Sequence, residues 1–315
     1  MIELDIVKKA IVIPNRNKES MYTILSMPKT EVAEKKFIVF CNAGLVNKSG
    51  SGDVFRLIAD ILSKQGYYVL RFDQTGVGQS KGEIAHNVLN KIVFRKIQSG
   101  VFEQDTVDVV DWIQGNYAGA KIYLLGYCGG CISAILACVS RINKISGLIF
   151  LALPVLYSSL DKKSNIMREF DAWATCRLYI KKLLKPENYV RLLRGESDFN
   201  LIKGSFVSLT RHFKKNIYCW AFRNKDGIPD NDLFNWFFWE AFKKVMVNQK
   251  KVLILMASLD NETSEFNREF KTKVLDKRED YSKLCKLHYL EKTDHSLMFE
   301  ESRNYLIKLL LKWLN

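Results

Sequence analysis

The pentapeptide G-Y-C-G-G at residues 126–130 centres on the thiol of Cys128. The apolar run at 121–125 before it predicts a strand, and the stretch at 131–137 after it predicts a helix. A strand, the pattern G-x-nucleophile-x-G and a helix together make a sharp turn that lifts a nucleophile above the edge of a sheet. Small residues two positions before and after the nucleophile let the backbone reverse without clashes. A cysteine where serine is usual therefore indicates nucleophilic catalysis by a thiol.

Cys128 differs from the other cysteines because it occupies the single turn of this kind in the sequence. Most free cysteines are buried and act as small apolar residues. We expect that behaviour of Cys131, Cys138, Cys176, Cys219 and Cys285. For Cys128 we expect the positive end of the following helix to lower the pKa of the thiol and favour the thiolate. A reversible disulfide between Cys41 and Cys128 is an alternative use of the same thiol.

The composition is typical of a folded protein without a membrane span. The 315 residues suffice for one large α/β domain with an insertion. No apolar run reaches the roughly 18 residues that a span requires, and the first nine residues lack a signal-peptide layout. The seven cysteines show no metal-type pairs. We therefore expect a cytoplasmic protein without disulfides, metal or cofactor. No phosphate loop, zinc knuckle or RNA-binding aromatic motif is present, so we expect no nucleic-acid partner.

Strand-like and helix-like segments alternate along the chain and predict an α/β fold. Repeated β-α units of this length indicate a mostly parallel central sheet flanked by helices on both faces. We expect residues 10–28 to add an antiparallel hairpin at one edge of that sheet. The other expected strands lie at 36–40, 67–72, 121–125, 147–152, 251–256 and 286–290, with helices at 54–65, 102–114, 131–137 and 302–314.

The alternation breaks between residues 157 and 248, where aromatic-rich helical patterns contain no convincing strand. We therefore predict a core formed by residues 1–156 and 249–315, with a helical cap (lid) inserted at 157–248 before the penultimate strands. This segment holds 17 Lys and Arg against 10 Asp and Glu, an excess of +7 that is half of the chain's net charge of +14. The excess is either a solvated helical surface or a basic rim that attracts an anionic substrate.

The chain resembles the α/β-hydrolase superfamily over nearly all of its length except the cap, with four segments in the expected order. Within that superfamily, N-A-G-L-V at 42–46 and L-R-F-D-Q-T-G-V-G-Q-S at 70–80 are similar to exosortase-associated hydrolases. They are also similar to the serine aminopeptidase-like and acylglycerol-lipase-like branch. The resemblance implies an α/β-hydrolase fold. It also implies that Asp73, in the second segment, fixes a turn and does not take part in the chemistry.

The resemblance also implies a Cys-His-Asp triad in the chain order nucleophile, acid, base. The superfamily places its catalytic histidine between the last strand and the last helix, where T-D-H-S-L at 293–297 supplies His295. It places the acid after the strand that ends near residue 256, where A-S-L-D-N at 257–261 resembles the family's G-x-x-D turn. Asp260 is therefore the expected acid, with Asp294 as its rival.

An oxyanion hole is implied in the same way, formed by the backbone N–H groups of Gly129 and Leu45. At Cys41 and Asn42 the sequence departs from the His-Gly that relatives often carry. By resemblance, cysteine nucleophiles in this superfamily belong to dienelactone hydrolases and polyhydroxyalkanoate synthases. They indicate activated esters, lactones or thioesters as substrates ahead of peptides.

These observations predict an enzyme that hydrolyses a small acyl substrate, as an esterase or thioesterase does, through a thioester on Cys128. An acyltransferase is the first alternative. It would pass the acyl group from coenzyme A or an acyl carrier protein to an amine or alcohol. The second alternative is a catalytically silent hydrolase-fold protein that binds a ligand.

Overall fold

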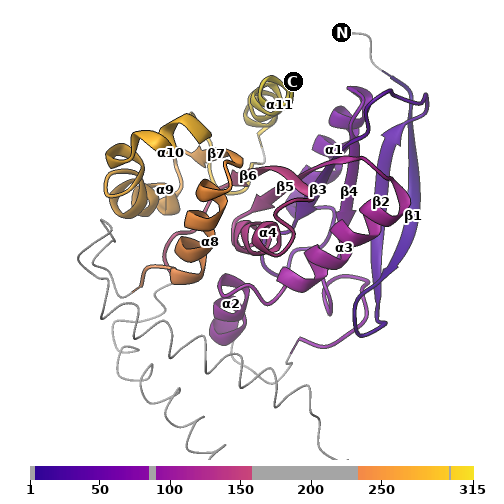
Figure 1. The fold of residues 1–315 in the computed structure, drawn as a ribbon, viewed down its shortest axis with the longest axis horizontal. Helices are drawn as coiled ribbons and strands as arrows, with labels where there is room; N and C mark the ends of the chain where they lie inside the picture. Colours follow the sequence, from indigo (N-terminus) through magenta and orange to yellow (C-terminus); the bar gives the residue numbers. More distant parts are fainter. Residues whose placement is uncertain (1–3, 85–89, 158–232, 298) are drawn as a thin grey trace, which may run out of the picture. The chain divides into compact units, whose positions relative to one another are not determined.

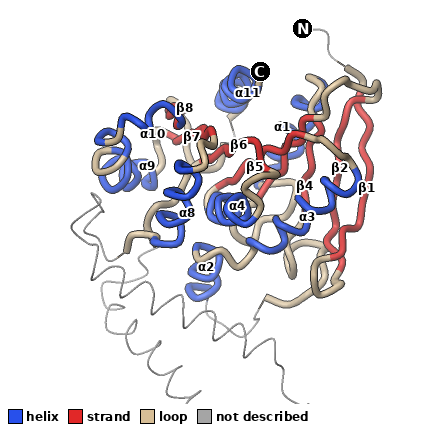
Figure 2. The backbone as a smooth tube through the Cα atoms, in the orientation of Figure 1, coloured by secondary structure: helices blue, strands red, loops and turns tan. Residues whose placement is uncertain are grey.

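The fold is an α/β structure built on one eight-stranded sheet (Figures 1 and 2). Contacts group Met1–Tyr157 and Asn231–Asn315 into one compact unit. Within this unit the strands form a central layer, and helices cover both of its faces (Figure 2). The computed structural model describes residues 4–84, 90–157, 233–297 and 299–315.

The strand order of the sheet is β1-β2-β4-β3-β5-β6-β7-β8. β1 and β2 form an antiparallel hairpin at one edge, and β2 runs antiparallel to β4. All other neighbouring strands are parallel. The expected edge hairpin and the mostly parallel sheet are thereby confirmed. The strands are β1 (Ile6–Pro14), β2 (Ser20–Pro28), β3 (Lys36–Cys41), β4 (Tyr68–Phe72), β5 (Lys121–Tyr127), β6 (Ile145–Leu151), β7 (Lys251–Ala257) and β8 (Cys285–Leu290).

Helices occupy the connections between the parallel strands, as the alternation predicts. No helix in the described part of the chain has both the length and the apolar character needed to cross a bilayer. The α-helices are α1 (Val54–Lys64), α2 (Asn90–Gln98), α3 (Glu103–Asn116), α4 (Gly129–Ser140), α8 (Trp236–Val247), α9 (Asn261–Phe266), α10 (Glu279–Leu284) and α11 (Glu300–Leu314). Shorter helical turns are η1 (Ser51–Asp53), η2 (Asn267–Lys271) and η3 (Leu275–Lys277).

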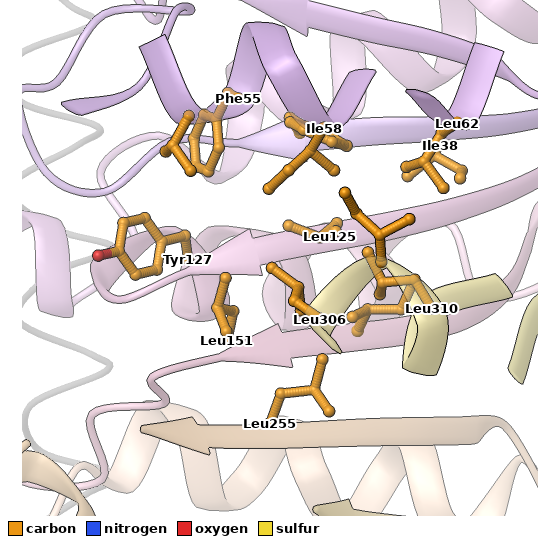
Figure 3. Packing of buried hydrophobic residues seen from close by; sticks show 14 of the residues in the cluster. Ile38, Phe55, Ile58, Leu62, Leu125, Tyr127, Leu151, Leu255, Leu306 and Leu310 are labelled. Atoms are coloured by element: carbon orange, nitrogen blue, oxygen red, sulfur yellow. The ribbon is translucent and has the colours of Figure 1, made fainter. Parts of the chain in front are cut away.

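One face of the sheet packs against α1 and α11. Ile58 of α1 and Leu310 of α11 are buried against Leu125 of β5 and Leu255 of β7 (Figure 3). The central strands are apolar toward both faces because helices cover both, as is usual for parallel sheets. Burial of each large apolar side chain contributes about 1.5–3 kcal/mol. This core fixes β5 and β7, whose carboxyl ends carry Cys128 and, three residues beyond, Asp260.

The opposite face is covered by α3, α4 and α8 (Figure 1). Asn235 caps α8, because its side-chain oxygen accepts a hydrogen bond from the Phe238 N–H at 3.1 Å. The amide of Asn235 also donates to the carbonyl of Gln98 at 2.7 Å, which joins α8 to the end of α2. The Phe238 ring packs edge-on against Phe150 of β6.

The expected boundary at residue 248 between cap and core is wrong, because α8 belongs to the core. Residues 157–248 were predicted to be cap, yet α8 packs on α4 and buries Trp239 and Phe242 in the core. The described residues from Leu233 onward therefore belong with the core. The sequence did not separate this helix from a cap because its aromatic side chains suit either environment. The rest of the expected cap, up to residue 232, lies outside the described residues.

Candidate active site

Cys128 is the single residue between the end of β5 and the start of α4. Its backbone adopts φ 49° and ψ −125°, a conformation that costs a non-glycine residue roughly 1–3 kcal/mol. Two hydrogen bonds hold the turn. The Cys128 N–H donates to the carbonyl of Leu151 at 2.9 Å, and the Cys128 carbonyl accepts from the Cys131 N–H at 2.9 Å. The strained turn presents the thiol at the carboxyl edge of the sheet.

Two glycines allow this turn because other backbone passes very close to them. A Cβ on Gly126 would lie 2.5 Å from the Cα of Cys131. A Cβ on Gly130 would lie 2.1 Å from the carbonyl oxygen of Cys41. Both distances are shorter than any real contact, so only glycine fits at either position. The spacing of the pentapeptide is thus a packing requirement of the turn.

His295 and Asp260 meet at the same edge of the sheet as Cys128. The Nδ1 atom of His295 lies 2.6 Å from Oδ2 of Asp260, which is a short, charge-assisted hydrogen-bond distance. Asp260 is the N-cap of α9, and its Oδ1 accepts from the Glu262 N–H at 3.0 Å. The loops after β7 and β8 are joined by a backbone bond from Leu259 to Thr293 at 2.9 Å. Asp260 and His295 therefore meet although they are 35 residues apart.

Asp294, the rival acid, does not contact the histidine ring. Its Oδ1 accepts hydrogen bonds from the N–H and the hydroxyl of Ser296, at 3.0 and 2.7 Å. Asp294 therefore stabilises its own turn, and Asp260 is the carboxylate at Nδ1 of His295.

Tyr127 contacts His295 from beneath, and the sequence analysis did not single it out. The two rings stack with centroids 5.2 Å apart, and the tyrosine hydroxyl donates to the carbonyl of His295. Burial raises the pKa of Tyr127, so this hydroxyl stays a donor. The residue before the nucleophile therefore positions the loop that carries the histidine.

Glu262 is the second site residue that sequence reasoning missed. Its Oε1 lies 3.9 Å from Sγ of Cys128, and its Oε2 lies 3.9 Å from Nδ1 of His295. Burial raises the pKa of Glu262 to about 7, with the neighbouring charges of Asp260 and Glu265 adding to the rise. An acid two residues after Asp260 was visible in the sequence. Nothing in the sequence indicated that the first turn of α9 aims it at the thiol.

The pKa of Cys128 is shifted in the direction opposite to the expected one. Burial raises the pKa of the thiol, and the charge of Glu262 raises it further. Hydrogen bonds from His295 and from the Gly129 N–H act in the opposite direction but are outweighed. The helix N-terminus therefore does not lower the pKa of this thiol below its ordinary value, and a base beside the thiol assists the removal of its proton.

His295 has the character of such a base. Its hydrogen bond with Asp260 raises the pKa of the imidazole, and contact with Cys128 raises it further, while burial opposes both. Burial alone would raise the pKa of Asp260, but the hydrogen bonds from His295 and the Glu262 N–H lower it. Asp260 therefore stays ionised and makes His295 a stronger proton acceptor.

The loop that follows β3 lies beside the elbow. The N–H nitrogen of Gly44 is 3.7 Å from the position that a Cβ on Gly129 would take. In the described part of the chain, Leu45 donates its N–H to no other backbone group. Gly129, as the first residue of α4, has no intrahelical acceptor. The loop after β3 therefore lies next to the residue that follows Cys128. The oxyanion-hole roles of Leu45 and Gly129 stay predictions.

Cys41 is fully buried beside Thr106, with its Sγ 3.8 Å from that hydroxyl. Burial raises the pKa of Cys41 to about 12, which makes its thiol a poor nucleophile. Cys41 and Cys128 are both free thiols in this structure. The alternative of a reversible disulfide between them stays a prediction.

The sequence model of the alpha/beta hydrolase fold matches residues 37–261. The chain belongs to this family. The matched residues include the elbow at Cys128 and the acid at Asp260, while His295 lies beyond them. The family agrees with the strand order and with the strand–elbow–helix turn described above, and it identifies the protein as a hydrolase-type enzyme.

Relatives of this α/β hydrolase include monoglyceride lipase of Rattus norvegicus, 28% identical over 131 residues, which are 42% of this chain and 39% of that protein. Monoglyceride lipase of Mus musculus is 31% identical over the same shares of the two chains. The chain thus matches about two fifths of the length of these curated relatives. Solved structures show the same fold. An esterase of Pyrococcus furiosus is similar at a TM-score of 0.55 and 14% identity, covering 98% of this chain and 90% of that one.

Proposed function

We propose that this α/β hydrolase is an acyl hydrolase that cleaves an ester, lactone or thioester through a covalent thioester on Cys128. The observation that carries the proposal is the contact of 2.6 Å between His295 and Asp260 at the edge where the strained turn presents Cys128. A nucleophile, a base and a group that orients the base are the three parts that acyl transfer requires.

In the proposed reaction, His295 removes the proton from the Cys128 thiol through Nε2, while Asp260 accepts the hydrogen bond of Nδ1–H. The sulfur attacks the acyl carbonyl carbon, and the developing oxyanion takes hydrogen bonds from the N–H groups of Gly129 and Leu45. The imidazolium then gives its proton to the leaving group as the thioester forms. A water molecule, deprotonated by His295, attacks the thioester and releases the acid and the thiol.

The thiol indicates the substrate class within this proposal. A thiolate attacks acyl groups readily but leaves a tetrahedral intermediate more easily than an amine does, so unactivated amides are poor substrates. The net charge of +14 favours an anionic donor such as coenzyme A or an acyl carrier protein. A reducing compartment such as the cytoplasm would keep the thiol active. Residues 42–46 and 70–80 support a subgroup similar to exosortase-associated hydrolases.

Intact-protein mass spectrometry with p-nitrophenyl esters and acyl thioesters tests this proposal. We expect an acyl adduct on the wild type, its loss in Cys128→Ala, and slow deacylation in His295→Ala. Cys138→Ala and His288→Ala are matched controls, because each removes the same residue type outside the site and should leave the adduct unchanged.

The fate of the adduct separates hydrolysis from its alternatives. Release in buffer supports hydrolysis, whereas an adduct that persists until an amine or alcohol is added indicates an acyltransferase. No adduct with any donor, from a folded protein whose Cys128 also resists iodoacetamide, would refute acyl catalysis and favour a silent, ligand-binding protein.

A further inference from the structure

Three potential metal ligands from three different elements meet at the active-site edge. A sulfur of Cys128, a carboxylate oxygen of Glu262 and a ring nitrogen of His295 all lie within 4.8 Å of one another. Cys128 comes from the β5–α4 turn, Glu262 from α9 and His295 from the loop before α11. The proposed hydrolysis uses the thiol and the imidazole but gives Glu262 no part.

One carboxylate oxygen of Glu262 lacks a hydrogen-bond donor in the described part of the chain. Its Oε2 is buried and has no hydrogen-bond donor among the residues that the structure describes. Buried polar atoms in native proteins nearly always have a partner, so this oxygen keeps lone pairs that a water molecule or a cation can take.

We propose that Cys128, Glu262 and His295 form a binding site for Zn²⁺. Thiolate, imidazole and carboxylate are the three ligand types that zinc uses, and three protein ligands leave a fourth position open for water. The thiolate and imidazole select zinc over calcium or magnesium, which prefer oxygen ligands. On binding, the Sγ–H bond is replaced by an Sγ–Zn bond, and the proton leaves to solvent.

Asp260 completes the arrangement from outside the ligand set. Its carboxylate takes Nδ1 of His295 at 2.6 Å, which leaves Nε2 as the ring atom able to bind the metal. A carboxylate behind a metal-bound histidine fixes the ring and raises its basicity, and such partners recur at zinc sites. Without metal, His295 supported by Asp260 accepts the proton of the thiol. With metal bound, His295 supported by Asp260 is a ligand of the zinc.

The distances require only a small adjustment of side chains. Bond lengths of about 2.3 Å to sulfur and about 2.0–2.2 Å to nitrogen or oxygen give tetrahedral edges of roughly 3.3–3.7 Å. The distance from Sγ to Oε1 is 3.9 Å, and no distance within the group exceeds 4.8 Å. The atoms therefore need to approach one another by at most about 1.5 Å.

The spacing of the ligands explains why the sequence predicts no metal site. More than a hundred residues separate Cys128 from Glu262, so no local motif exists. A metal on Sγ would occupy the lone pair that attacks the acyl carbon. Zinc would thus be a reversible inhibitor, a consequence that rests on the proposed function, whereas binding itself does not.

Metal binding by the chelator-treated full chain tests the site without reference to activity. We expect one Zn²⁺ per chain by competition with a chromophoric chelator, and a thiolate-to-cobalt charge-transfer band with Co²⁺. Cys128→Ala should abolish that band, and Glu262→Gln should weaken Zn²⁺ affinity at least about tenfold. Asp260→Asn should weaken it by about 10- to 100-fold, as loss of a partner behind a metal-bound histidine does.

Glu265→Gln is the matched control, because it removes a neighbouring acid of α9 that lies outside the ligand group and should change affinity less than about twofold. Equal Zn²⁺ affinity in the wild type and Glu262→Gln would overturn the site, as would binding that survives in Cys128→Ala. Absence of stoichiometric binding to the wild type would overturn it as well, even if the acyl adduct on Cys128 forms.

Discussion

Two turns at the same edge of the sheet carry buried acids that differ in how fully they are satisfied. After β4, the fully buried carboxylate of Asp73 accepts from the N–H and the ammonium of Lys48, at 2.6 and 2.7 Å, and from the Gln79 N–H at 2.9 Å. After β7, Asp260 meets the half-exposed ring of His295, and Glu262 keeps one buried oxygen without a donor.

The difference in hydrogen bonding distinguishes an acid that holds a turn from acids at a candidate site. Every oxygen of the Asp73 carboxylate is used by residues that close the loop carrying Leu45, so this acid has nothing left for a ligand. This agrees with the expected role of Asp73 in fixing a turn. The acids after β7 are incompletely paired, and incomplete pairing next to a nucleophile is typical of a functional site.

The largest expected effect is a loss of activity when the acid in the turn after β7 is replaced. Asp260→Asn should lower kcat by about 10³–10⁴-fold, because asparagine cannot hold the imidazole with its proton on Nδ1 or stabilise the imidazolium. Initial rates with a p-nitrophenyl ester measure this. Asp294→Asn changes a carboxylate that accepts hydrogen bonds from Ser296 and should stay within a few-fold of the wild type. Equal losses in the two variants would contradict the assignment of the acid.

A substitution in the turn after β4 should lower the stability of the fold. Asp73→Ala should lower the free energy of unfolding by about 3–5 kcal/mol, because it leaves the largely buried Lys48 ammonium without its partner. Urea denaturation measures the change. Asp276→Ala breaks an exposed pair with Lys271 and should cost less than about 1 kcal/mol. A loss at Asp73 no larger than that control would mean that the turn is not held by this carboxylate.

Glycine substitutions in and away from the elbow separate the effect of close packing from that of helix propensity. Gly130→Ala forces a Cβ against the Cys41 carbonyl and should destabilise the fold by about 1–3 kcal/mol or more. Gly115→Ala, in α3 with nothing within 4 Å, should stabilise it by up to about 1 kcal/mol. Thermal unfolding of both variants measures the two changes. Equal shifts of the same sign would show that close backbone contact does not explain the glycine at 130.

The smallest effect concerns the pH dependence of stability beside the β4 turn. Burial raises the pKa of Asp105 to about 6, despite hydrogen bonds from the N–H and hydroxyl of Thr75. Because the folded pKa exceeds the unfolded one, this group stabilises the fold at low pH, and the contribution is lost as pH rises through about 6. Between pH 5 and pH 8 the loss is about 1–1.5 kcal/mol.

Urea denaturation of the wild type and Asp105→Asn at the two pH values measures that loss. The asparagine does not ionise, so the wild type should lose stability relative to the variant as pH rises. A difference between the two proteins that stays constant from pH 5 to pH 8 would show that Asp105 does not titrate in this range.

Much of the fold was predictable because its signals are local. Apolar runs located β3, β4, β5, β6 and β7 to within about two residues, and the pentapeptide located the elbow. The predicted cap included α8, because an apolar, aromatic helix has the same local pattern wherever it packs. The order of Cys128, Asp260 and His295 along the chain placed them at a common edge, since parallel strands end on the same side of a sheet.

The sequence by itself determined the parallel sheet, the elbow and Cys128, because periodicity and turn geometry depend on neighbouring residues. The candidates Asp260 and His295 came from the resemblance of their segments to the superfamily. Only the tertiary structure decided that Asp260 and not Asp294 meets the ring, that Tyr127 supports it and that Glu262 faces the thiol. It also decided that burial outweighs the helix N-terminus and raises the pKa of the Cys128 thiol. Those properties depend on burial and on side chains from distant strands, whose effects are set by packing.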